Sequence, residues 1–124
     1  MPHDFLRDFL YWANRMYQIV FYVPDTHLER VKEVLFEAGA GKIGDYEACA
    51  WQTLGQGQFR PLEGSQPYLG QTGQVEQVAE YKVELVCEQP VLKAAVAALL
   101  EAHPYEEPAY SIWPLVDVDS LGVG

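Results

Sequence analysis

Basic residues are scarce in this chain, which has 8 Lys and Arg against 18 Asp and Glu and a formal net charge of −10. Contacts to nucleic-acid phosphates need Lys and Arg, so this imbalance argues against a DNA- or RNA-binding protein. Long hydrophobic runs are missing too. None approaches the ~20 residues of a membrane span, and no signal-peptide pattern opens the chain. We therefore expect an acidic cytoplasmic protein that binds neither nucleic acid nor membranes.

Cysteine is equally sparse, with Cys49 and Cys87 as the two thiols. If residues 42–53 and 75–88 pair as a hairpin, Cys49 falls opposite a residue near position 79 and is out of register with Cys87. This register favours two reduced thiols with a structural role over a disulfide staple.

The chain does contain enough apolar material for one folded domain, since 49% of its 124 residues are hydrophobic and 13% are aromatic. A β-branched and aromatic run at 17–23 predicts a central strand covered on both faces. Thr26 and Glu29 then fit a capping box, and Gly39 and Gly41 supply a helix stop. Between them, apolar residues recur with helical spacing: Leu28, Val31, Leu35 and Ala38.

The second half of the chain repeats the strand and helix pattern after a long polar connection. Residues 42–53 predict a second strand, and residues 54–74 form either a functional loop or a long hairpin extension anchored by Phe59 and Tyr68. Alternation at 75–88 predicts a third strand that places Tyr81, Val83, Leu85 and Cys87 on one face. Pro90 begins a second helix, and a last strand follows at 110–115.

The resulting order, βαββαβ, predicts an α+β, ferredoxin-like fold with a four-stranded antiparallel sheet and two helices on one face. This domain is expected at 16–115, with an acidic C-terminal tail at 116–124. The N-terminal extension at 1–15 either forms an amphipathic helix or precedes a true translation start at Met16. The apolar face of that helix would comprise Phe5, Leu6, Phe9, Leu10 and Trp12.

Three sequence blocks occur within this domain. They are Ala38-Gly39-Ala40-Gly41-Lys42-Ile43-Gly44-Asp45-Tyr46 followed by Cys49, then Gly55-x-Gly57-x-Phe59-x-Pro61-x-x-Gly64, and finally His103-Pro104-Tyr105-Glu106-Glu107-Pro108-Ala109-Tyr110. In this order they resemble the domain inserted in YqfO-type, Nif-three-like proteins, which carry a dinuclear metal core. The last block is also similar to the His-Pro-Tyr corner of CutA, whose fold is shared with the PII signalling proteins.

The resemblance covers about residues 16–115 and implies a stand-alone inserted domain that assembles as a homotrimer. The His- and Asp-rich ligand motifs of the metal core have no counterpart in this sequence, so the activity of that core is not implied. Because each copy carries a formal charge of −10, contacts between copies must be apolar. The candidates for these contacts are Val20, Tyr22, Trp51 and Trp113.

The block at 103–110 admits two interpretations. His103 and Glu106 are candidate ligands of a divalent metal, but Pro104 forbids a continuing helix, so helical metal spacing does not apply. Such a site would need help from His27, Asp45, Glu47 or another subunit. In the structural interpretation, a partly positive His103 suits the C-terminal dipole of the helix, and Tyr105 packs beneath the turn.

The sequence does not indicate a hydrolase, because no Ser/His/Asp or Cys/His grouping lies in a sequence context that supports catalysis. We therefore expect no catalytic residues, no required cofactor and no enzyme activity. Lys42 and Arg60 are the only basic residues near the long loop, which disfavours nucleotide binding.

Three functions remain. The favoured one is a non-catalytic, oligomeric module of the PII and CutA type that binds a small ligand, a metal or a partner protein through its long loop and inter-subunit clefts. The first alternative is a CutA-type divalent-metal-binding protein that uses the corner of His103 and Glu106. The second alternative is an accessory domain that serves a dinuclear-metal hydrolase core in trans.

Overall fold

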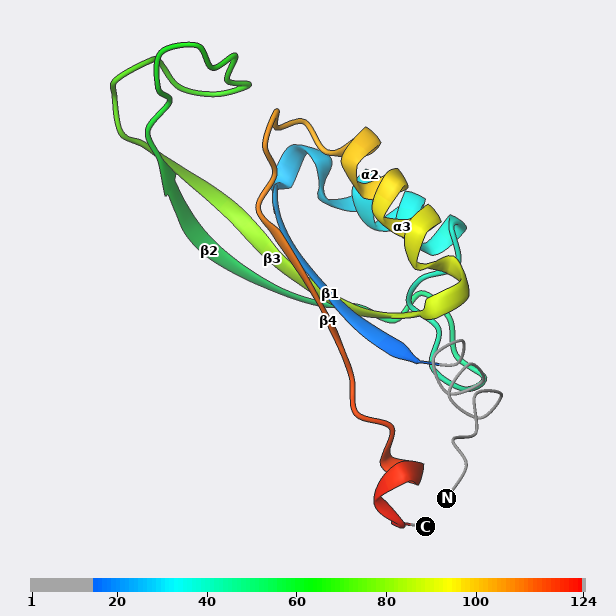
Figure 1. Ribbon diagram of the computed structural model, residues 1–124. Helices are drawn as coiled ribbons and strands as arrows, with labels where there is room; N and C mark the ends of the chain where they lie inside the picture. Colours follow the sequence, from blue (N-terminus) through cyan, green and yellow to red (C-terminus); the bar gives the residue numbers. More distant parts are fainter. Residues whose placement is uncertain (1–14, 124) are drawn as a thin grey trace.

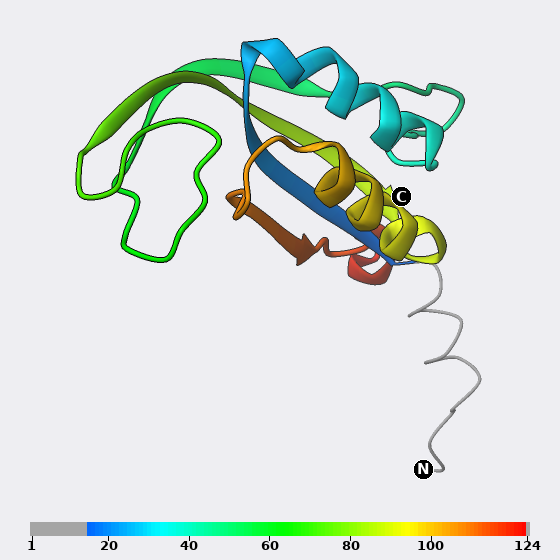
Figure 2. The same cartoon turned by 90° about the horizontal axis from the view of Figure 1, so that it is seen from above.

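The computed structural model of this protein describes residues 15–123. A single four-stranded antiparallel sheet, in the order β2-β3-β1-β4, is covered on one face by two helices (Figures 1 and 2). The elements follow the chain as β1 (Met16–Pro24), α2 (Asp25–Glu37), β2 (Trp51–Phe59), β3 (Glu76–Glu88), α3 (Gln89–Ala102) and β4 (Tyr110–Pro114). The predicted α+β, ferredoxin-like βαββαβ fold is confirmed.

The core lies between the helices and the sheet, as the alternation in the sequence predicts. Odd-numbered residues of β1 and β3 face the helices, because antiparallel partners such as Ile19 and Leu85 share a face. Full burial of each large aliphatic or aromatic side chain contributes about 1.5–3 kcal/mol. The buried cluster comprises Ile19, Phe21, Val23, Val83, Leu85 and Cys87 of the sheet with Leu28, Val31, Leu35, Ala95 and Leu99 of the helices.

The hairpin of β2 and β3 is longer than the rest of the sheet. Its pairing runs from Trp51 opposite Glu84 to Phe59 opposite Glu76, and its tip extends beyond the helices as an arm (Figure 1). The predicted second strand at 42–53 is therefore wrong in its bounds. Residues 54–59 extend the hairpin, as one of the two alternatives predicted, and residues 60–75 form the long loop between the two strands.

The segment between α2 and β2 is a compact loop because its backbone departs from the extended conformation. Gly39, Gly41 and Gly44 have positive φ angles of 105°, 80° and 55°, and Ala48 has a φ of 57°. A strand cannot continue through such residues. Both cysteines are free thiols, as predicted. The register used to predict this was wrong, since Trp51, two residues after Cys49, pairs with Glu84.

The first helix begins without the predicted capping box. Its N-cap residue is Pro24, and no side chain caps it. The Thr26 hydroxyl instead lies 2.9 Å from His27 Nδ1, so it does not reach back to the free backbone N–H groups of the first turn. None of the described helices has the length and apolar character needed to cross a bilayer. In the predicted acidic tail, a short 3-10 helix, η1 (Val118–Leu121), follows the sheet.

Gly41 offers a direct test of the loop that precedes β2. A Cβ at this position would lie 2.8 Å from Phe36 Cε1 and 3.1 Å from the Cys49 carbonyl oxygen, whereas a Cβ at Gly44 would meet nothing within 4 Å. Both glycines have positive φ, so Gly44→Ala should cost roughly 1–2 kcal/mol of backbone strain. We expect Gly41→Ala to cost roughly 1–3 kcal/mol more through overpacking. Equal losses of unfolding free energy in urea would contradict this account.

Candidate functional site

The block at 103–110 forms a tight corner that fastens the end of α3 to β1. His103 is the C-cap residue of α3 and is only 6% exposed. Its Nε2 lies 2.6 Å from the Tyr22 carbonyl oxygen, and its Nδ1 accepts a hydrogen bond of 3.1 Å from the Tyr105 backbone N–H. A second link runs from the Tyr22 backbone N–H to the Ala109 carbonyl oxygen, at 3.2 Å. The corner is thus a joint built around one imidazole.

These contacts set the protonation state of His103. Because Nδ1 accepts a hydrogen bond, the ring proton sits on Nε2 and is donated to the Tyr22 carbonyl. Burial lowers the pKa of His103 from its usual 6.5, and the positive field of His27 lowers it slightly further, although the bond to Tyr22 acts in the opposite direction. The imidazole is therefore neutral near pH 7. The expected partly positive His103 at the helix dipole is wrong for this reason.

The metal ligands predicted at this corner are both engaged in other contacts. His103 uses both ring nitrogens, and Glu106 Oε2 accepts a hydrogen bond of 3.0 Å from the Gln66 backbone N–H. Within residues 15–123, no group of three or more His, Cys, Asp or Glu is placed to hold a metal ion. A metal at His103 would have to break one of the two bonds that define the corner. A divalent metal at His103 and Glu106 stays a prediction.

The other predicted helpers of a metal site are dispersed. The His27 ring packs edge-on against Tyr68, with ring centroids 5.7 Å apart. Asp45 and Glu47 lie in the loop before β2, which hydrogen-bonds to the Val86 carbonyl through Gly41. That loop is at the opposite end of the sheet from the corner (Figure 1). The structure therefore brings His27 near the corner but separates Asp45 and Glu47 from it.

A cleft of about 380 Å³ opens between this corner and the loop at 60–75, and we call it the hairpin cleft. Aromatic contacts and the hydrogen bond to Glu106 hold the loop against the corner. Tyr105 lies 6.1 Å, centroid to centroid, from both Phe59 and Tyr68. The walls combine aromatic rings with charged groups: Tyr22, Phe59, Tyr68 and Tyr105 with Arg60, Glu80, Glu106 and Glu107.

Two polar groups of the hairpin cleft lack partners. Burial raises the pKa of Glu80 above its usual 4.5, and its carboxylate has no ion pair or hydrogen bond within the described part of the chain. The Tyr105 hydroxyl oxygen is buried and has no hydrogen-bond partner there either. Burial first, and then the charge of Glu80 and the neighbouring Tyr68, raises the pKa of Tyr105. A buried hydroxyl without a partner, as at Tyr105, is uncommon in folded proteins, whereas Glu80 is only partly buried.

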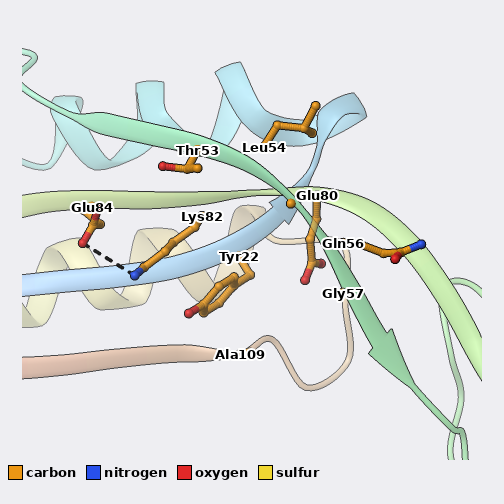
Figure 3. A pocket seen from close by; sticks show the side chains of 10 residues that line it. Tyr22, Thr53, Leu54, Gln56, Gly57, Glu80, Lys82, Glu84 and Ala109 are labelled. Carbon is orange, nitrogen blue, oxygen red and sulfur yellow. Dashed lines mark ion pairs between the residues drawn. The ribbon is translucent and has the colours of Figure 1, made fainter.

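A second hollow, of about 540 Å³, adjoins the hairpin cleft on the sheet face away from the helices. We call it the open-face hollow, and it shares Tyr22, Glu80 and Ala109 with the cleft. Figure 3 shows Glu80 beside Gly57, while Lys82 turns toward Glu84. The Lys82 ammonium lies 3.8 Å from the Glu84 carboxylate and so does not neutralise Glu80.

Solved structures with this fold define its class. CutA from Xylella fastidiosa superposes with a TM-score of 0.60 at 20% identity, covering 86% of this chain and 91% of CutA. The GlnK–ATP complex of B. subtilis gives a TM-score of 0.55 at 10% identity, over 82% of each chain. Identities this low establish the fold alone. The chain therefore has the ferredoxin-like fold that CutA and GlnK also have.

Sequence comparison relates this chain to a narrower group of proteins than its fold does. It is 43% identical over 113 residues to a GTP cyclohydrolase 1 type 2 homolog of Halalkalibacterium halodurans, and 40% identical over 104 residues to one from Bacillus subtilis. A Bacillus cereus protein related to NIF3 superposes with a TM-score of 0.73 at 39% identity, over 86% of this chain and 27% of that protein. No family model matches. The chain is thus homologous to one segment of the NIF3-like proteins, as its sequence blocks predicted.

The chain spans 30% of the length of the H. halodurans relative and 28% of the B. subtilis relative. The aligned segment does not include the greater part of either protein. The activities of those whole proteins therefore cannot be assigned to this chain from homology alone.

Sequence reasoning missed Tyr22 and Glu80 as cleft residues. Both lie on strands at even-numbered positions, which alternation assigns to the face away from the helices. Glu80 also pairs with Gly55, the first glycine of the second sequence block. A carboxylate facing a glycine-rich strand is the signal that could have marked this position.

Lowering the pH should destabilise the fold through His103. Since its folded pKa lies below 6.5, the unfolded chain binds the proton more readily. The stability that the neutral ring contributes is fully present above the unfolded pKa and is lost as pH falls through the folded pKa. We expect His103→Gln to be less stable than the parent at about pH 7.5, by roughly 1–3 kcal/mol, but to lose less on acidification to about pH 5.5.

Urea unfolding at both pH values measures this effect. His27→Gln is the matched control, because it removes a histidine outside the joint and should keep most of the pH dependence. An unchanged pH dependence in His103→Gln would contradict the buried neutral imidazole.

Proposed function

We propose that this chain is a non-catalytic, homo-oligomeric module that binds a small ligand in the hairpin cleft. The observation that carries the proposal is the way the loop is fastened over the cleft. Gln66 bonds to Glu106, and Tyr68 packs against both His27 and Tyr105. The cleft volume of about 380 Å³ lies within the range of about 300–1,000 Å³ that is usual for ligand sites.

The lining of the cleft supports binding over catalysis. Its serine, Ser65, donates its hydroxyl proton to the Leu62 carbonyl oxygen at 2.6 Å and not to a base. Neither histidine nor cysteine lines the cleft. Nucleophilic catalysis needs a nucleophile within hydrogen-bond reach of a base, and this lining supplies no such pair.

Ligand binding in the cleft is tested by two-dimensional NMR of the ¹⁵N-labelled full chain against a library of small organic fragments. We expect fragments to shift the amide signals of Phe59, Tyr68 and Tyr105 together. Tyr68→Ala removes the ring that joins the loop to the corner, so it should reduce fragment affinity roughly tenfold, because loss of an aromatic contact of about 0.5–1.5 kcal/mol adds to the loss of apolar contact area. Tyr46→Ala removes a tyrosine that is 76% exposed and should change nothing. Amide shifts that are scattered over the surface, or that Tyr68→Ala leaves unchanged, would contradict the proposal.

The oligomeric part of the proposal rests on the sheet face away from the helices. Trp51 and Trp113 remain 69% and 44% exposed there, and Val20 lies between their strands. Large exposed aromatic side chains on one face are typical of protein–protein interfaces. We propose a trimer of identical chains that meet through this face, with the charge of −10 per copy kept outside the contact.

Sedimentation at micromolar concentration tests the assembly. Trp113→Glu should shift the protein toward monomer, because it places a charge in the apolar contact. Leu100→Glu is the control: Leu100 belongs to α3 on the covered face of the sheet and is 43% exposed, so its charge should leave the assembly intact. A parent protein that sediments only as monomer would refute the trimer.

The role of an accessory domain for a hydrolase core in trans also stays a prediction. The homology of this chain to one segment of larger proteins is compatible with it. Co-purification with a core that lacks this segment would be its test.

A further inference from the structure

We infer that the hairpin cleft takes a small organic cation, an ammonium group carried on a flat or apolar body. The inference rests on the proposed function and names the class of ligand for the same site. Three carboxylates line the cleft, those of Glu80, Glu106 and Glu107, against the single guanidinium of Arg60. The lining therefore has an excess of negative charge, which favours a positively charged ligand.

Glu80 is the group that most needs such a partner. Its carboxylate is partly removed from water and has no ion pair or hydrogen bond within the residues that the structure describes. Partial burial makes the charged carboxylate less favourable, and a positive or hydrogen-bonding group would compensate for the lost water. The neighbouring Lys82 pairs with Glu84 on the other side, 3.8 Å away. An ammonium ligand would supply the missing positive charge and up to three N–H donors.

The aromatic walls favour the same class of ligand. The cleft is lined by rings from β1, the end of β2, the loop at 60–75 and the corner: Tyr22, Phe59, Tyr68 and Tyr105. The face of an aromatic ring carries a negative quadrupole and attracts cations within about 6 Å, by about 0.5–2 kcal/mol. An anion would meet both this quadrupole and the three carboxylates.

Tyr105 adds a hydrogen-bonding group next to the charge. Its buried hydroxyl has no partner in the described chain, and the charge of Glu80 reaches it. An ammonium or a polar substituent of the ligand can use the lone pairs of that oxygen. A ligand with several N–H donors could therefore bind both the Glu80 carboxylate and the Tyr105 hydroxyl.

The Glu80 carboxylate lies against Gly57, a residue of the open-face hollow that adjoins the cleft. A Cβ on Gly57 would overlap the Glu80 carboxylate directly, so the side chain occupies the space that a larger residue would fill (Figure 3). Gly57 is not among the glycines with positive φ, so its backbone conformation does not require glycine. What requires glycine is the space that the Glu80 carboxylate occupies. This placement gives a variant that moves the carboxylate without removing its charge.

Three probes of nearly equal size separate the charge from the apolar body: 2-phenylethylamine as the cation, 2-phenylethanol as the neutral analogue and phenylacetate as the anion. Each is titrated into the ¹⁵N-labelled full chain while the amides of Gly57, Phe59 and Tyr105 are followed. We expect the amine to bind at least tenfold more tightly than either analogue. Glu80→Gln should reduce amine affinity by roughly tenfold or more, as for the loss of a charge-assisted contact. Alcohol affinity should stay within about twofold.

Gly57→Ala should also weaken amine binding, because it displaces the carboxylate while the net charge stays the same. Glu37→Gln, at an exposed position of α2, is the control for the overall charge and should leave the affinity unchanged. If all three probes bind equally at these amides, the cleft is a ligand site but the cation inference is overturned. If the amine binds elsewhere, or equally well to Glu80→Gln, the inference fails as well. If none of the probes binds, it also fails, and the fragment experiment decides separately whether the cleft binds anything.

Discussion

The hydrogen bonds of His103 connect the three parts of the candidate site. One ring nitrogen donates to the Tyr22 carbonyl and the other accepts from the Tyr105 backbone N–H. Through the first bond the end of α3 is held against β1, and through the second Tyr105 is oriented toward the loop at 60–75. The rings of Phe59 and Tyr68 then pack against Tyr105. The bond from the Tyr105 N–H requires an unprotonated Nδ1 and hence the neutral ring, which burial of the imidazole favours.

The sheet supplies two faces with different chemistry. The face under the helices is fully apolar at its centre, where Ile19, Phe21 and Val83 are buried. The other face carries Tyr22, Glu80 and Lys82 around a hollow, with exposed tryptophans on β2 and β4. Alternation along a strand produces this division automatically. Polar groups can therefore gather at the cleft without disturbing the core that stabilises the fold.

Much of the fold could be predicted because it follows local rules. The alternation in β3, the helical spacing of Leu28, Val31 and Leu35, and the proline at the start of α3 each identified an element. The start of β2 could not be predicted, because the positive φ of Ala48 depends on its surroundings and not on its own preference. The charge state of His103 was equally inaccessible, since it depends on burial of the ring against distant parts of the chain, such as Tyr22, 81 positions away in the sequence.

The hairpin cleft and the sheet face of the proposed assembly share Glu80. Its side chain lines both the hairpin cleft and the hollow on the open sheet face. A second copy that covered this face would remove further water from the carboxylate and strengthen its need for a positive partner. By thermodynamic reciprocity, a cation bound at Glu80 would then favour assembly as much as assembly favours the cation. Every residue of the cleft lies between positions 22 and 109. This coupling therefore requires nothing from the larger part of the NIF3-like proteins that this chain does not match.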